Sequence, residues 1–149
     1  MSTRAGQERL LASLRDEKNR LQYLSHNDWM LLLDRAKPVT FKKGDVLVQQ
    51  ASQSNTLYVI ASGKVKVSIS GKVLAQIGPG EICGEMAFLE DSRSSATATA
   101  EEEVQAFSIE WKTLIELFEL FPHLASRFYR SLAVNLSRRL REQIVQKKT

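Results

Sequence analysis

Residues 56–69 read TLYVIASGKVKVSI, which is two short apolar segments separated by Ser62-Gly63. In the second segment Val65, Val67 and Ile69 alternate strictly with polar residues, and both segments are rich in β-branched side chains. Strict alternation places the apolar side chains on one face of a β-strand, and a serine–glycine pair is a common turn signal. The stretch therefore predicts two neighbouring β-strands.

The same pattern continues on both sides of this stretch. Further short segments of this kind are separated by turn signals such as Gly44, Ser70-Gly71 and Gly78-Pro79-Gly80. Seven or eight strands, spaced at intervals of roughly ten residues, predict an antiparallel sandwich or roll. The further segments are residues 39–41, 45–48, 72–77, 96–100 and 104–109.

Helical patterns flank the strands. Residues 7–22 place leucines at mostly helical spacing among charged residues, and a second helix is expected after Ser25, an N-cap candidate with Asp28 three residues later. That helix should end before Pro38, because the residue before a proline is pushed out of the α region.

Two helices are expected after the strands. The first covers residues 110–121 and is interrupted by Pro122, and the second starts near His123. We expect one domain over residues 1–149, with N-terminal helices in 1–37, a β-roll in 38–110 and C-terminal helices in 111–149. The last helix carries apolar residues spaced by four, namely Phe128, Leu132, Leu136, Leu140 and Ile144.

Charge is concentrated in the last helix. The net charge of the chain is +4, but residues 127–149 contain seven basic residues against Glu142 alone, a net charge of +6. Basic residues towards a helix C-terminus are common on solvated faces. A helix-turn-helix module needs some tens of residues after this helix, and about four follow Val145. We therefore expect no specific DNA binding by this chain.

Several other functional classes are disfavoured by composition. Cys83 is the single cysteine, which excludes an intrachain disulfide and favours a reducing compartment. No signal peptide or long apolar run is present, so we expect a soluble, cytoplasmic protein without a membrane segment. His26 and His123 lie far apart outside the strands, and we expect no metal site, no cofactor and no catalytic triad.

Residues 82–96 are too long for a hairpin turn, and long, partly structured loops inside compact domains are often functional. A short helix near Glu85 would present backbone N–H groups to an anion, and Arg93 would offer a forked donor to a phosphate. Ser94 and Ser95 add hydroxyls. A carboxylate for sugar hydroxyls and a guanidinium for a phosphate fit a nucleotide. The alternative is a salt bridge between Glu85 and Arg93 that closes the loop.

The chain resembles the cyclic-nucleotide-binding domain family. The resemblance covers roughly residues 24–145 and is carried by Phe41-Lys42-Lys43-Gly44-Asp45, by residues 57–65, and above all by Gly84-Glu85-Met86-Ala87-Phe88-Leu89 followed by Ala96-Thr97. It implies a mainly β fold, a jelly-roll-like β-roll (a double-stranded β-helix) with N-terminal helices and two C-terminal helices. Residues 82–97 would be its phosphate-binding cassette.

The resemblance also implies residue roles. Glu85 would hold the ribose 2′-hydroxyl, the backbone around Gly84, Met86 and Ala87 would line the sugar and phosphate, and an arginine late in the cassette would neutralise the phosphate. The family usually places this arginine nine or ten residues after the glutamate, whereas Arg93 follows Glu85 by eight. Either the cassette is shorter and Arg93 turns inward, or Ser94 or Ser95 stands in the arginine position and the anchor is missing.

These observations lead to one functional expectation and one alternative. The expected function is a non-enzymatic sensor of a cyclic nucleotide, cAMP ahead of cGMP, whose ordered cassette repositions the C-terminal helices towards an effector or a second copy of the chain. The alternative is a β-roll that has lost ligand binding and serves as a protein-interaction or dimerisation domain. Because the family often uses its last helix as a lid, the candidate lid residues are Arg138, Arg141 and Gln143.

Overall fold

The fold is that of a computed structural model, which describes residues 3–13, 21–90 and 92–148. Two helices, α1 (Thr3–Ser13) and α2 (His26–Leu33), precede the strands. Part of the helix expected over residues 7–22 lies outside the described residues. Ser25 is the N-cap of α2, and the capping box with Asp28 is confirmed, since each side chain accepts a hydrogen bond from the other residue's backbone N–H.

Eight antiparallel strands form two four-stranded sheets, which confirms the β-roll. The first sheet has the order β1-β8-β3-β6 and the second the order β2-β7-β4-β5. The predicted pair in residues 56–69 is β3 and β4, and the two strands lie in different sheets. The strands are β1 (Lys37–Phe41), β2 (Val46–Val48), β3 (Thr56–Ser62), β4 (Val65–Ile69), β5 (Lys72–Ile77), β6 (Ile82–Cys83), β7 (Thr97–Ala100) and β8 (Val104–Glu110).

Strand β3 of the first sheet is buried on both faces. Leu57 and Val59 of β3 belong to an apolar cluster shared with the helices, whereas Ile60 belongs to a second cluster between the two sheets. A strand covered on both sides must be apolar at nearly every position, which explains the unbroken Leu-Tyr-Val-Ile run. The core therefore has two layers, one on each side of β3 and β8.

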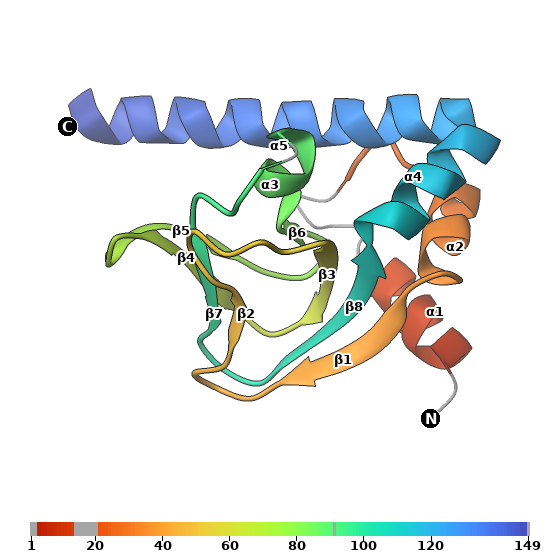
Figure 1. Ribbon diagram of the computed structural model, residues 1–149, viewed down its shortest axis with the longest axis horizontal. Helices are drawn as coiled ribbons and strands as arrows, with labels where there is room; N and C mark the ends of the chain where they lie inside the picture. Colours follow the sequence, from red (N-terminus) through yellow and green to blue (C-terminus); the bar gives the residue numbers. More distant parts are fainter. Residues whose placement is uncertain (1–2, 14–20, 91, 149) are drawn as a thin grey trace.

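The remaining helices lie on one side of the roll (Figure 1). A short helix, α3 (Glu85–Glu90), interrupts the strands, and α4 (Trp111–Leu120) follows β8. The long helix α5 (Pro122–Lys148) runs along the roll beside α3 and extends past it. The break predicted at Pro122 is confirmed, because α4 ends at Leu120 and Phe121 leaves helical geometry with φ −131° and ψ 78°.

The apolar residues of α5 do not form one buried stripe. Phe128 and Leu132 are buried, Leu136 is half-buried, and Leu140 and Ile144 are exposed. A step of four residues rotates by about 40° around a helix with 3.6 residues per turn, so residues spaced by four leave the buried face. The second half of α5 consequently presents apolar side chains to solvent.

Candidate functional site

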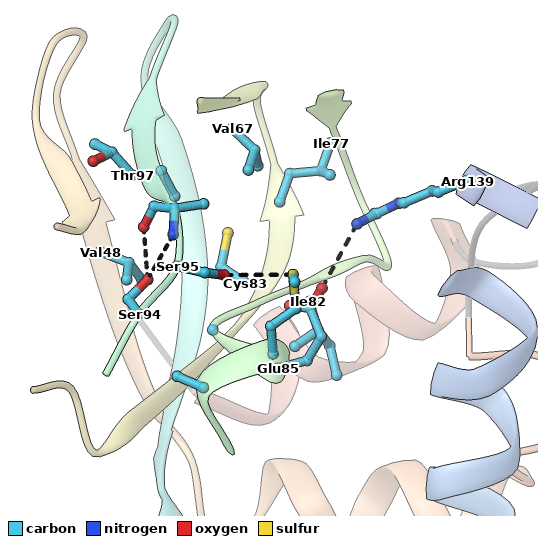
Figure 2. Close-up of a pocket in the computed structure, with 15 residues that line it drawn as sticks. Val48, Val67, Ile77, Ile82, Cys83, Glu85, Ser94, Ser95, Thr97 and Arg139 are labelled. Carbon is cyan, nitrogen blue, oxygen red and sulfur yellow. Dashed lines mark hydrogen bonds and ion pairs between the residues drawn. The ribbon is translucent and has the colours of Figure 1, made fainter. Parts of the chain in front are cut away.

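A cavity of about 60 Å³ lies between the second sheet, the start of α3 and the side of α5 (Figure 2). Its lining is mainly apolar, and Glu85 and Arg139 contribute the charged groups among the described lining residues. The cavity collects residues from six separate parts of the chain. They are Val48, Val67, Ile77, residues 82–87, residues 94–98 and Arg139.

Gly84 makes the sharp turn from β6 into α3. Its φ is +90°, and a β-carbon at this position would lie 3.0 Å from the carbonyl oxygen of Thr56. Only glycine adopts this conformation at no steric cost. The turn places Glu85 at the first position of α3 with its side chain at the cavity.

Glu85 is a buried carboxylate. Its side chain is 11% exposed, and burial raises the pKa of this carboxyl above its usual value although the nearby Arg139 lowers it. Arg139 Nη1 lies 3.6 Å from Glu85 Oε1, which exceeds hydrogen-bond distance. The oxygens of Glu85 are therefore placed to accept a hydrogen bond from a hydroxyl group in the cavity.

Arg139 reaches the cavity from α5, as Figure 2 shows. Its Nη2 donates a 2.6 Å hydrogen bond to Glu81 Oε1. Glu81 Oε2 in turn accepts a 2.7 Å bond from the backbone N–H of Gly78. Glu81 thus links the turn after β5 to α5 and fixes the direction of the Arg139 side chain.

The predicted residues of the cassette are brought together in part. Gly84, Glu85, Met86, Ala87, Ser94 and Ser95 all line the cavity. The Ser94 hydroxyl is used within the loop, because it donates to the carbonyl oxygen of Ala96 at 2.6 Å and accepts from the Ala96 N–H at 3.3 Å. Their roles towards a ligand stay predictions.

Arg93 is not among the lining residues. It is exposed, and its Nη1 donates a 3.2 Å hydrogen bond to the carbonyl oxygen of Ala51. The neighbouring backbone holds this position, since Ser94 exchanges hydrogen bonds with Ala51 N–H and Ser52 carbonyl at 2.7 and 3.1 Å. The alternative of a salt bridge between Arg93 and Glu85 does not describe this arrangement, because Glu85 lies beside Arg139 instead.

The candidate lid residues also lie outside the cavity lining. Arg138 donates a 2.9 Å hydrogen bond to Gln22, and Arg141 and Gln143 are exposed. Sequence reasoning missed Arg139, although the helical period contains the signal. Arg139 follows the buried Leu132 by seven residues and therefore lies about 20° from it around the helix.

The first half of α5 is fixed against α2. Asp28 accepts bonds of 2.6 and 2.8 Å from Arg127, and this forked contact lowers the pKa of the Asp28 carboxyl. The Ser131 hydroxyl accepts a 3.1 Å bond from the backbone N–H of Tyr23. These contacts hold α5 in place on the side of α2, while Arg139 holds it beside the cavity.

The described residues form neither a metal site nor a membrane-spanning helix. Within residues 3–13, 21–90 and 92–148, no group of three or more His, Cys, Asp or Glu side chains is arranged to hold a metal ion. None of the helices in this part of the chain is long and apolar enough to cross a membrane. Cys83 is buried at the cavity, and burial raises the pKa of its thiol well above the usual value.

Comparisons with known proteins agree with this geometry. Residues 38–120 match the family described as the cyclic nucleotide-binding domain. Two relatives are the Cyclic GMP-binding protein C of Dictyostelium discoideum, 32% identical over 79% of this chain, and the Cyclic AMP receptor protein of Thermus thermophilus, 34% identical over 68%. The chain matches 5% and 48% of the lengths of these two relatives, respectively.

A solved structure supports the same relationship. The Thermus thermophilus catabolite activator protein superposes with a TM-score of 0.68 at 30% sequence identity, covering 84% of this chain and 59% of that one. The similarity therefore covers most of this chain and little more than half of that protein.

Proposed function

Since the chain belongs to the cyclic nucleotide-binding domain family, we propose that it is a non-enzymatic sensor module that binds a cyclic mononucleotide in the cavity beside Glu85. We propose cAMP as the first ligand to test and cGMP as the second, because the relatives named above include proteins named for either nucleotide. Binding reaches the rest of the molecule through α5.

The buried carboxylate of Glu85 carries this proposal. Burial raises the pKa of this acid, although a hydrogen bond to its own backbone N–H and the charge of Arg139, whose Nη1 lies at 3.6 Å, lower it. A ribose hydroxyl would donate a further hydrogen bond to the carboxylate. Hydrogen bonds to a charged group contribute about 1.5–3 kcal/mol each, enough to select a ligand that carries this hydroxyl.

The size of the cavity supports coupling to α5. Ligand pockets commonly measure about 300–1,000 Å³, whereas this cavity measures about 60 Å³. A nucleotide therefore enters only when the walls separate, and Arg139 of α5 is one of the walls. Binding energy would then be converted into a displacement of α5, with Phe121-Pro122 as the hinge. Such a displacement requires the contacts of Arg127 with Asp28 and of Ser131 with Tyr23 to separate.

A second candidate function is a protein-interaction or dimerisation domain. It is favoured by the exposed apolar side chains of Leu140, Ile144 and Val145 on the second half of α5. Such a face fits an effector or the same helix of a second copy. In the sensor proposal this face binds a partner in response to the nucleotide, whereas in the second candidate it binds a partner without any nucleotide.

Calorimetry with cAMP and cGMP tests the sensor proposal. We expect cAMP to bind, and Glu85→Gln to weaken binding about tenfold, because a charge-assisted hydrogen bond is lost. The matched ligand is 2′-deoxy-cAMP, which lacks the hydroxyl assigned to Glu85. It should bind to the unmodified chain about tenfold more weakly than cAMP does. Its affinity should be the same for the unmodified chain and for Glu85→Gln.

Thermal unfolding separates the two candidates. A ligand at 100 times its dissociation constant adds about 2.7 kcal/mol to the free energy of unfolding, which raises Tm by roughly 5–11 °C for a domain of this size. If neither nucleotide at millimolar concentration produces heat or a Tm shift, the sensor proposal is wrong and the interaction domain is favoured.

A further inference from the structure

A cyclic mononucleotide brings a negative charge into the cavity. Its phosphodiester is ionised at neutral pH, and burying an unpaired charge is costly. Glu85 adds a second negative charge in the lining, and a third carboxylate, Glu81, forms an ion pair with Arg139 at 2.6 Å. The site therefore needs a cation that reaches the phosphate, and the identity of that cation decides how binding is transmitted.

The cassette does not supply this cation. The Arg93 guanidinium lies on the carbonyl oxygen of Ala51, outside the lining. Ser94, which lines the cavity, is neutral and its hydroxyl is bonded to Ala96. To turn Arg93 inward, the paired backbone of Ser94 with Ala51 and Ser52 would have to separate.

Arg139 is the cationic side chain among the described residues that line the cavity. Glu81 orients it through the 2.6 Å bond to Nη2. Its Nη1 lies 3.6 Å from Glu85 and makes no hydrogen bond with that carboxylate. A planar guanidinium held at one nitrogen still offers donors at its other nitrogens in a geometry that matches phosphate oxygens.

We propose that Arg139 of α5, in place of a cassette arginine, binds the phosphodiester of the ligand. This inference rests on the proposed function and names the residue that sets its charge preference. Glu81 keeps its bond to Nη2, the phosphate takes the donors at Nη1, and Glu85 turns from Arg139 to the ribose hydroxyl. The guanidinium that neutralises the phosphate then belongs to α5, the helix that is displaced when the ligand binds.

The test compares a charged ligand with a neutral one. Affinities for cAMP and adenosine are measured by NMR titration or calorimetry for the unmodified chain and for Arg139→Gln, Arg139→Lys and Arg93→Gln. The matched control is Arg130→Gln, which removes the same charge from the same helix. Arg130 lies over the Tyr23 ring at 4.1 Å, away from the cavity lining. Circular dichroism confirms that each variant is folded.

The expected pattern is specific to the phosphate. Arg139→Gln weakens cAMP binding tenfold or more and changes adenosine binding less than twofold, whereas Arg139→Lys, which keeps the charge, recovers part of the loss. Arg93→Gln and Arg130→Gln leave both affinities within twofold. Adenosine reports the integrity of the cavity, so damage to the fold would weaken both ligands alike.

Three results overturn the inference while leaving the sensor proposal intact. They are unchanged cAMP affinity in Arg139→Gln, an equal loss of cAMP and adenosine affinity in that variant, and a tenfold loss confined to cAMP in Arg93→Gln. If the unmodified chain binds neither cAMP nor cGMP, the sensor proposal itself fails, and the inference fails with it.

Discussion

At the scale of single residues, Glu85 is placed at a cost to stability. Burial is the main cause that raises the pKa of its carboxyl above the ordinary value of 4.5, and it outweighs the lowering by a backbone hydrogen bond and by Arg139. Above the raised pKa the folded protein must hold an ionised carboxylate that it disfavours. Sites that bind ligands often retain such costs.

The first prediction concerns Glu85→Gln. This variant removes the ionisable group, so we expect it to unfold at higher denaturant than the unmodified chain at pH 7. The advantage should shrink as the pH falls through the raised pKa and vanish below about pH 4.5, the ordinary value of this carboxyl. Urea unfolding at pH 4 and pH 7 measures it. A variant that is less stable at pH 7 would show that Arg139 compensates the charge fully.

The residue scale also shows what sequence reasoning can and cannot reach. The short helix near Glu85 was predictable, and Gly84 precedes it with a φ of +90°, which glycine adopts without steric cost. It was harder to predict which arginine lies beside Glu85. Arg93 is close to Glu85 in sequence, yet its side chain lies on Ala51, whereas Arg139 comes to Glu85 from 54 positions further along the chain. Local spacing does not contain that contact.

At the scale of elements, strands and helix breaks were predictable because their signals are local. The pattern of short apolar segments predicted every strand except β6, which lies in the stretch interpreted as a loop. Pro122 predicted the break between α4 and α5, and Ser25 predicted the start of α2. The assignment of β3 and β4 to different sheets is not local, since β3 pairs with β6 and β8 while β4 pairs with β5 and β7. Which face of α5 is buried depends on helical phase over several turns.

The second prediction concerns the start of α2. Ser25 Oγ accepts a 3.1 Å hydrogen bond from the Asp28 N–H, and Asp28 also holds Arg127 of α5. Ser25→Ala should lower the free energy of unfolding by about 1 kcal/mol, or Tm by about 2–4 °C. Ser25→Thr keeps the hydroxyl and should lose less than half of this. Equal losses in both variants would contradict a role for the cap.

At the scale of the whole molecule, aromatic rings connect the cassette to the C-terminal helices. Phe88 of α3 contacts Trp111 of α4 edge-on at 5.7 Å between centroids, and it stacks on Tyr129 of α5 at 6.4 Å. Phe118 of α4 contacts Tyr129 as well, at 5.4 Å. A shift of α3 therefore changes the surroundings of both α4 and α5, because packed interiors do not deform smoothly.

The third prediction uses Trp111 as a reporter of that shift. The only other tryptophan is Trp29, so the measurement is made in Trp29→Phe, where cAMP should change the Trp111 emission. Adding Phe88→Leu removes the ring between Trp111 and Tyr129. We expect it to cost about 1–2 kcal/mol of stability, less than a change to alanine.

Phe88 does not line the cavity, so cAMP affinity should change less than threefold in the double variant, whereas the emission change should fall by at least half. If both the affinity and the emission change are retained, the rings do not carry the displacement. The contact between Arg139 and the ligand would then have to produce the displacement alone. Because Arg139 belongs to α5, the ligand would in that case move α5 directly, without a contribution from α3.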